Sequence, residues 1–173
     1  FFDNRLTSIT ISDSVTSIGG QAFQKNFLSS VTIPDGVISL GWGAFLDNKL
    51  TSVTIPDSLT LIANRVFYKN RLTSITIGNS VTSIAYQAFE SNLLTNVTIP
   101  DSVTFIDSRA FFDNRLTSIT IPDSVIELSG FSGNQLTSVI IGNSVTSIGI
   151  EAFRINQLTS VTIPNSVTSI GIE

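Results

Sequence analysis

The amino-acid sequence predicts a β-rich repeat solenoid. One motif recurs at a fixed spacing, the apolar residues fall into columns, and part of each repeat alternates with the period of a strand. The motif is Asn-x-Leu, which occurs first at Asn4/Leu6 and last at Asn156/Leu158. Successive leucines of this motif lie 22 residues apart, except that 20 residues separate Leu116 from Leu136. The chain therefore consists of eight repeats.

Each repeat predicts a strand, a turn, a second strand and a compact turn, as the third repeat illustrates. Residues 50–55 (LTSVTI) end in an in, out, in alternation that β-branched residues fill, which is typical of a strand. Pro56-Asp57-Ser58 then predicts a turn, because Pro presets φ and Asp can bond the nearby backbone. Residues 59–62 are long enough for a second short strand. The Ala-Phe-x-x-Asn segment, which reads Val-Phe-Tyr-Lys-Asn at 66–70 in this repeat, predicts a short helical or 3₁₀ turn.

The apolar columns predict the core. A repeat of this length has one apolar side that it cannot bury alone, so we expect the coils to stack at the spacing of paired strands. We expect the Asn column to turn inward as well, because a buried amide needs hydrogen-bond partners. The result is a single solenoid domain over residues 1–173, interpreted as a piece of a longer array without visible caps. The column that fills the interior with rings comprises Phe1, Phe23, Phe45, Phe67, Phe89, Phe111, Phe131 and Phe153.

The repeats resemble the BspA-type leucine-rich repeats of bacterial surface proteins, most closely at residues 50–56, 94–111 and 158–171. The resemblance implies a right-handed leucine-rich-repeat superhelix of eight 22-residue coils. It also implies an extracellular or cell-surface location in a bacterium, and a role in adhesion. One departure is the sixth unit, Leu128-Ser129-Gly130-Phe131, which has lost two residues, so we expect a local irregularity there.

Composition argues against several classes of function. The chain has no Cys and no His, and its net charge is −4. Thiolate and imidazole metal sites, and nucleophiles or bases built on those side chains, are therefore absent, and the negative charge argues against nucleic acid as a partner. No run of 18 apolar residues predicts membrane insertion. The Asp column of the turns is interpreted as turn formers rather than catalytic pairs or calcium ligands. We therefore predict no enzyme, no cofactor and no metal.

The positions around Gly-x-x-Ala-Phe-x-x differ most between repeats, and they predict where a partner binds. Specificity needs differences, and Trp, Tyr and Arg are the residue types that most often anchor partners. An alternative interpretation is that these residues cover the Phe column and pack between coils. The candidate partner-binding residues, for a protein or glycan ligand, are Trp42, Arg65, Tyr68, Tyr86, Arg109 and Phe112.

Three further expectations concern the rest of the surface. The outward Ser-x-Thr ranks, from Ser8/Thr10 to Ser160/Thr162, make ice binding the alternative function if their face is flat. A column of basic residues beside Asp residues, such as Arg115 beside Asp113, is interpreted as solvated ion pairs. Open strand edges at Phe1 and Glu173 predict head-to-tail self-association.

Overall fold

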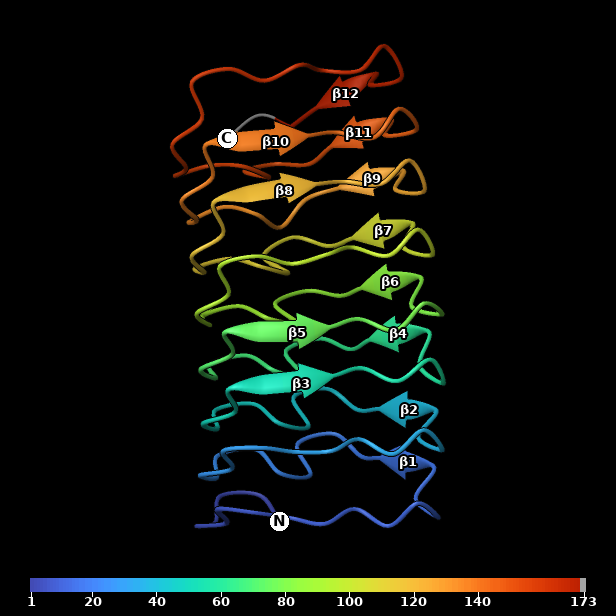
Figure 1. Cartoon of the computed structure of the whole chain (residues 1–173), viewed down its shortest axis with the longest axis vertical. Coiled ribbons are helices and arrows are strands. Elements are labelled where there is room, and N and C mark those ends of the chain that lie inside the picture. The colour runs from blue at the N-terminus through green and yellow to red at the C-terminus, as the bar shows by residue number, and fades with distance from the viewer. Residues whose placement is uncertain (172–173) are drawn as a thin grey trace.

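The protein is a parallel β-solenoid, seen in a computed structural model that describes residues 1–171 (Figure 1). Each coil contributes a segment to a front face and a segment to a rear face. The chain runs in one direction across the front and returns behind as it rises from the N-terminus, so the winding is right-handed (Figure 1). The front strands are β3 (Ser52–Thr54), β5 (Ser74–Thr76), β8 (Ser118–Thr120) and β10 (Ser138–Ile140). The rear strands are β1 (Ser17–Ile18), β2 (Ser39–Leu40), β4 (Leu61–Ile62), β6 (Ser83–Ile84), β7 (Phe105–Ile106), β9 (Glu127–Leu128), β11 (Ser147–Ile148) and β12 (Ser169–Ile170).

Equivalent residues of neighbouring coils lie above one another, as the repeat predicts. All described strand pairs are parallel, and Ser52 pairs with Ser74 in the front register. The rear strands form a six-stranded sheet from β4 to β12 and a pair, β1 and β2. The shortened sixth repeat keeps this register, because Ser118 pairs with Ser138. The two missing residues are therefore absorbed elsewhere in that coil.

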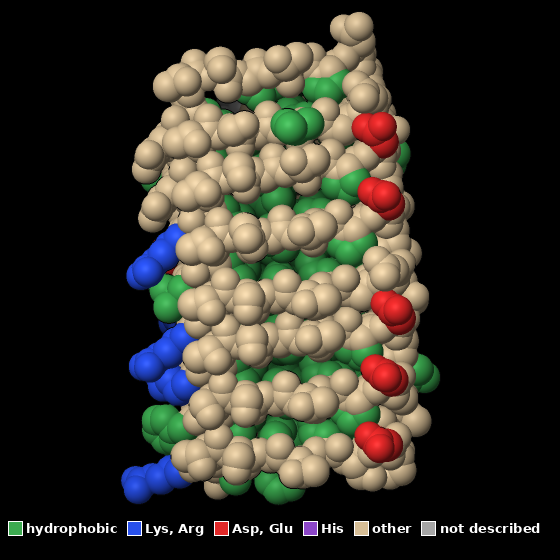
Figure 2. Space-filling view, in the orientation of Figure 1, with side chains coloured by type: hydrophobic (Ala, Val, Ile, Leu, Met, Phe, Trp, Pro, Cys, Tyr) green, Lys and Arg blue, Asp and Glu red, His purple; other side chains and the backbone are tan. Residues whose placement is uncertain are grey.

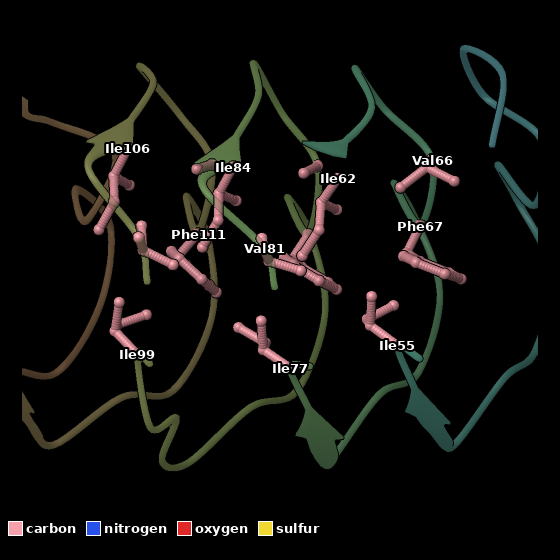
Figure 3. Packing of buried hydrophobic residues seen from close by; sticks show 14 of the residues in the cluster. Ile55, Ile62, Val66, Phe67, Ile77, Val81, Ile84, Ile99, Ile106 and Phe111 are labelled. Atoms are coloured by element: carbon pink, nitrogen blue, oxygen red, sulfur yellow. The ribbon is translucent and has the colours of Figure 1, made fainter. Parts of the chain in front are cut away.

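The core is a set of side-chain ladders that run along the solenoid axis. Phe, Ile and Val side chains of successive coils point into the same interior (Figure 3). The Phe rings stack from Phe1 to Phe153 with centroids 5.1–5.9 Å apart and planes within 12° of parallel. Offset stacks of this kind stabilise beyond their buried area. The five rings from Phe45 to Phe131 are completely buried, so the predicted Phe column is confirmed as core.

The Asn column turns inward, as predicted, and each amide links two coils. In Asn92, Oδ1 accepts a hydrogen bond from the Leu72 backbone N–H at 3.0 Å. Its Nδ2 donates to the Phe67 and Phe89 carbonyls, each at 3.0 Å. The same pattern recurs from Asn26 to Asn156. A buried amide with all these partners fixes both the bend of its own coil and the position of the coil below.

Two predicted elements differ within residues 1–171. The first strand of the repeat forms in four of the eight repeats, as β3, β5, β8 and β10, and the helical or 3₁₀ turn is absent, since these residues contain no helix. Consecutive turns replace it, with bonds such as Val66 N–H to Ala63 O and Tyr68 N–H to Arg65 O. Arg65 and Lys69 have φ of 56° and 54°, in the left-handed region, and equivalent residues of other coils share this conformation. A left-handed residue reverses the local winding and ends a helix after one turn.

The front face pairs only where glycine follows the strand. Four front segments form two separate pairs, β3 with β5 and β8 with β10. In each pair the upper coil continues into Gly-Asn, at Gly78 and Gly142, and a Cβ there would lie 2.8 and 2.4 Å from the carbonyl oxygen of the Pro below. Coils that carry Pro at this position do not pair their front strands with the coil below in the described residues. Glycine thus allows the close approach that proline prevents.

Candidate functional site

The six predicted partner-binding residues lie on one surface, between the rear strands and the Asn column. We call this surface the variable edge and define it by Trp42, Arg65, Tyr68, Tyr86, Arg109 and Phe112. Backbone hydrogen bonds between coils set the columns. The Arg65 N–H donates to the Tyr86 carbonyl at 3.0 Å, and the Gln87 N–H donates to the Ser108 carbonyl at 3.4 Å. The predicted column of Trp42, Asn64, Tyr86 and Ser108 is therefore confirmed.

Tyr68 and Phe112 occupy a second, neighbouring column of the variable edge. The Asp47 N–H donates to the Tyr68 carbonyl at 2.8 Å, and the Ser91 N–H donates to the Phe112 carbonyl at 2.9 Å. None of the six side chains is buried: Trp42 is 41% exposed, and Tyr68 and Phe112 are partly buried. The edge therefore presents aromatic and cationic groups to solvent rather than enclosing them between coils.

Cation–aromatic contacts orient the rings of the variable edge. The guanidinium of Arg65 lies 5.7 Å from the Tyr86 ring centroid, and that of Arg109 lies 5.1 Å from the Phe112 centroid. The Lys69 ammonium lies 5.2 Å from the centroid of the Tyr68 ring. Such contacts contribute about 0.5 to 1 kcal/mol each at exposed sites. They reduce the freedom of the rings, which lowers the entropy lost when a partner binds.

Two residues beneath this edge, Gln87 and Glu90, were not among the predicted binding residues. The Arg65 Nε–H donates to Gln87 Oε1, and Gln87 Nε2 donates to Glu90 Oε2 at 2.6 Å. Glu90 is only 4% exposed. Burial raises the pKa of the Glu90 carboxyl, while the Gln87 hydrogen bond and the charges of Arg109 and Arg65 act in the opposite direction. This chain of contacts, from the next coil, fixes the position of Arg65.

The shortened sixth repeat opens a groove next to the variable edge. Its volume is about 710 Å³, within the range of ligand sites. Tyr86 and Arg109 line one side and Ile150 and Glu151 the other, over a floor of small residues that includes Gly130. Gly130 has φ of 97°, and a Cβ on it would lie 2.5 Å from the Asp107 carbonyl oxygen. The expected irregularity is therefore a shortened turn before Phe131. It keeps the Phe131 ring in the core ladder and leaves the groove at the surface of this coil.

The Ser-x-Thr ranks do not form a continuous lattice. The front strands are joined in two separate pairs, and Ile140, which is 60% exposed, interrupts the Thr rank. These observations give no support to ice binding by this face.

Charged side chains gather on the two lateral edges instead of forming the predicted ion pairs. Figure 2 shows Lys and Arg along one edge and acidic side chains in a column along the opposite one. Within residues 1–171 the ion pair within 4.0 Å is Arg154 with Glu151, at 2.7 Å. The interpretation of the basic column as ion pairs with Asp3, Asp47 and Asp113 is therefore wrong. Two Asp side chains of the opposite edge bond backbone: Asp57 accepts from the Asn79 N–H and Asp123 from the Asn143 N–H, each at 2.6 Å.

Other expectations concern metal, membrane and self-association. In the described part of the chain, no three acidic side chains converge on a position that could hold a metal ion. Nor does that part contain a helix with the length and apolarity needed to cross a bilayer. Head-to-tail association stays a prediction. It depends on how the repeat that ends at Glu173 continues into the repeat at Phe1 of a second chain, and Glu173 lies outside the described residues.

Comparison with solved structures finds bacterial leucine-rich repeat proteins. A leucine-rich repeat protein from Bacteroides ovatus superimposes with a TM-score of 0.52 at 19% identity, over 93% of this chain and 67% of its own. A leucine-rich cell surface protein from Faecalibacterium prausnitzii gives 0.49 at 24% identity, over 92% of this chain and 59% of its own. At 19% identity the likeness to the Bacteroides ovatus protein is one of fold. A search of curated proteins finds no match.

The family comparison covers the whole chain. The model of the BspA type leucine-rich repeat region, which holds six copies, matches residues 1–115 and 84–173. These two matches overlap at the centre and include every repeat described above. The chain therefore belongs to the BspA-type leucine-rich repeat family.

Proposed function

We propose that this chain is a non-catalytic binding module of a bacterial cell-surface or secreted protein, with a role in adhesion, and that it contacts a protein or glycan partner through the variable edge. The family to which it belongs supports a role in binding, because leucine-rich repeat proteins are generally protein-interaction modules. The observation that carries the proposal is that this edge differs from coil to coil and presents oriented, partly buried rings.

The contrast with the other surfaces supports this location. The front ranks offer the same small hydroxyls at almost every coil, so they present little that could distinguish one partner from another. The variable edge combines Trp, Tyr and Arg, which dominate the binding energy of protein interfaces. Gln87 and Glu90 of the next coil hold Arg65 in place, and Arg65 in turn packs on Tyr86. The edge is thus preorganised before a partner arrives.

A binding screen tests the proposal. The chain and a Trp42→Ala/Tyr86→Ala variant are applied to a panel of host matrix proteins and to a glycan array. A Ser74→Ala/Thr76→Ala variant of the front face serves as the matched control. We expect the edge variant to bind its partner at least tenfold more weakly, since a central aromatic side chain contributes about 2 kcal/mol or more. Equal binding by the edge variant, with loss in the front-face variant, would place the site on the strands.

A further inference from the structure

The groove of the sixth repeat has the shape of a missing turn segment. In the complete coils, the N–H at the left-handed position donates to the carbonyl of the coil above, as from Gly43 to Asn64 at 3.0 Å and from Arg65 to Tyr86 at 3.0 Å. The two deleted residues are those that align with Ser108 and Arg109. The deletion therefore removes one step of this hydrogen-bond ladder.

Both sides of the groove carry backbone groups that the missing step would have paired. The Arg109 N–H, with φ of 58° at that residue, donates to no acceptor in residues 1–171. The Ile150 carbonyl, on the opposite side, accepts from no donor in the same residues. A donor and an acceptor thus face the groove from the fifth and the seventh coil. Every equivalent N–H in the four coils below Arg109 is paired, so this arrangement is specific to the deletion.

We propose that this groove binds a short peptide segment of the partner protein, which takes the place of the missing residues and completes the ladder. The proposal rests on the proposed function and specifies its site and ligand chemistry. Coils stack at about 4.8 Å, so the two sides lie about 10 Å apart, and one backbone segment fits between them at pairing distance from each. The carbonyl of that segment accepts from the Arg109 N–H, and its N–H donates to the Ile150 carbonyl.

The side chains around the groove add selectivity to this main-chain pairing. Ile150 is 62% exposed and, with the Tyr86 ring, provides apolar surface for one side chain of the peptide. Arg109 provides a positive charge on the same wall as the unpaired N–H, which favours an acidic residue near the bound carbonyl. Glu151 on the other wall is already paired with Arg154, so it adds no unpaired charge. The favoured ligand is therefore a linear peptide that contains an acidic and an apolar residue.

A variant that fills the groove tests the proposal. Insertion of Ser-Arg between Ser129 and Gly130, together with Gly130→Ala, restores a 22-residue repeat copied from 108–110. A displayed library of random linear peptides is selected on the wild-type chain, and the peptides are then measured on both proteins. We expect at least tenfold weaker binding to the filled variant. The control, Ser52→Arg on the front face, should bind as the wild type does.

A measurement on the wild-type chain keeps the test independent of how the filled variant folds. We expect the Arg109 amide to exchange with solvent faster than those of Arg65 and Gln87, and to become protected when a selected peptide is added. Peptides that bind both proteins equally, or an Arg109 amide that stays unprotected, would overturn the groove site while leaving the proposed function standing. Ligands found only on a glycan array would overturn the peptide assignment. If neither a peptide or protein nor a glycan is found to bind the chain, both the groove site and the proposed function are overturned.

Discussion

Replacement of Asn92 by alanine tests how the coils are held at their spacing. The change leaves the Leu72 N–H, completely buried, without its one acceptor, which costs about 1 to 3 kcal/mol. Two donated bonds are lost as well, each with a net contribution of about 0.5 to 1.5 kcal/mol. The carbonyls that accepted them keep partners in Asn70 and Asn114. We therefore expect the free energy of unfolding to fall by about 2 to 6 kcal/mol.

Urea unfolding followed by circular dichroism measures this loss. The matched control is Asn96→Ala in the same coil, where the side chain is exposed and we expect a change within about 0.5 kcal/mol. Asn92→Asp retains an acceptor for Leu72 but cannot donate to the two carbonyls, and it places a carboxylate in a buried site. We expect it to destabilise the chain at neutral pH at least as much as alanine does. An Asn92→Ala chain as stable as the Asn96→Ala control would refute the reasoning.

Three further predictions concern the strand pairing, a strained residue and a buried carboxyl. Gly78→Ala should separate β3 from β5 and lower the free energy of unfolding by about 1 to 3 kcal/mol. Hydrogen exchange of the Ile55 amide, which donates to Thr76, should become faster while the equivalent Ile121 amide stays slow, and unchanged exchange at Ile55 would contradict this. Ile155 is a β-branched residue in the left-handed region, with φ of 54° and 67% of its surface exposed, so Ile155→Asn should raise the free energy of unfolding by about 1 kcal/mol. A lower unfolding midpoint in urea would show that the backbone at Ile155 is not strained. The raised pKa of Glu90 means that the folded chain holds this proton more tightly than the unfolded chain, so the stability that Glu90 contributes falls as pH rises from the ordinary Glu pKa through the raised one. Glu90→Gln should therefore be more stable than the wild type at pH 7 and lose that advantage near pH 4. A stability advantage that does not change with pH would contradict this prediction.

The ladders could be predicted because they depend only on what each repeat contains. The Phe rings and the inward Asn side chains follow from a fixed repeat length, since register places like residues above like. The columns of the variable edge follow for the same reason, so Trp42 and Tyr86 lie where the repeat predicts.

What could not be predicted depends on contacts between neighbouring coils. The pairing of β3 with β5 needs glycine in one coil against proline in the next, and single-repeat patterns do not contain that comparison. The turn was expected to be helical because Gln, Lys and Arg give no signal for the left-handed region that they occupy here. The deletion was visible in the sequence, but the groove was not, because the chain could have absorbed two lost residues on any face.

The central claim is that the variable edge, and not the front face, binds the partner. Hydrogen–deuterium exchange of the chain, free and bound to the ligand from the binding screen, tests it directly. The account predicts slower exchange of segments 42–47, 64–69, 86–91 and 108–113 on binding, with segments 52–54, 74–76 and 118–120 unchanged. Protection confined to those three front segments would contradict it.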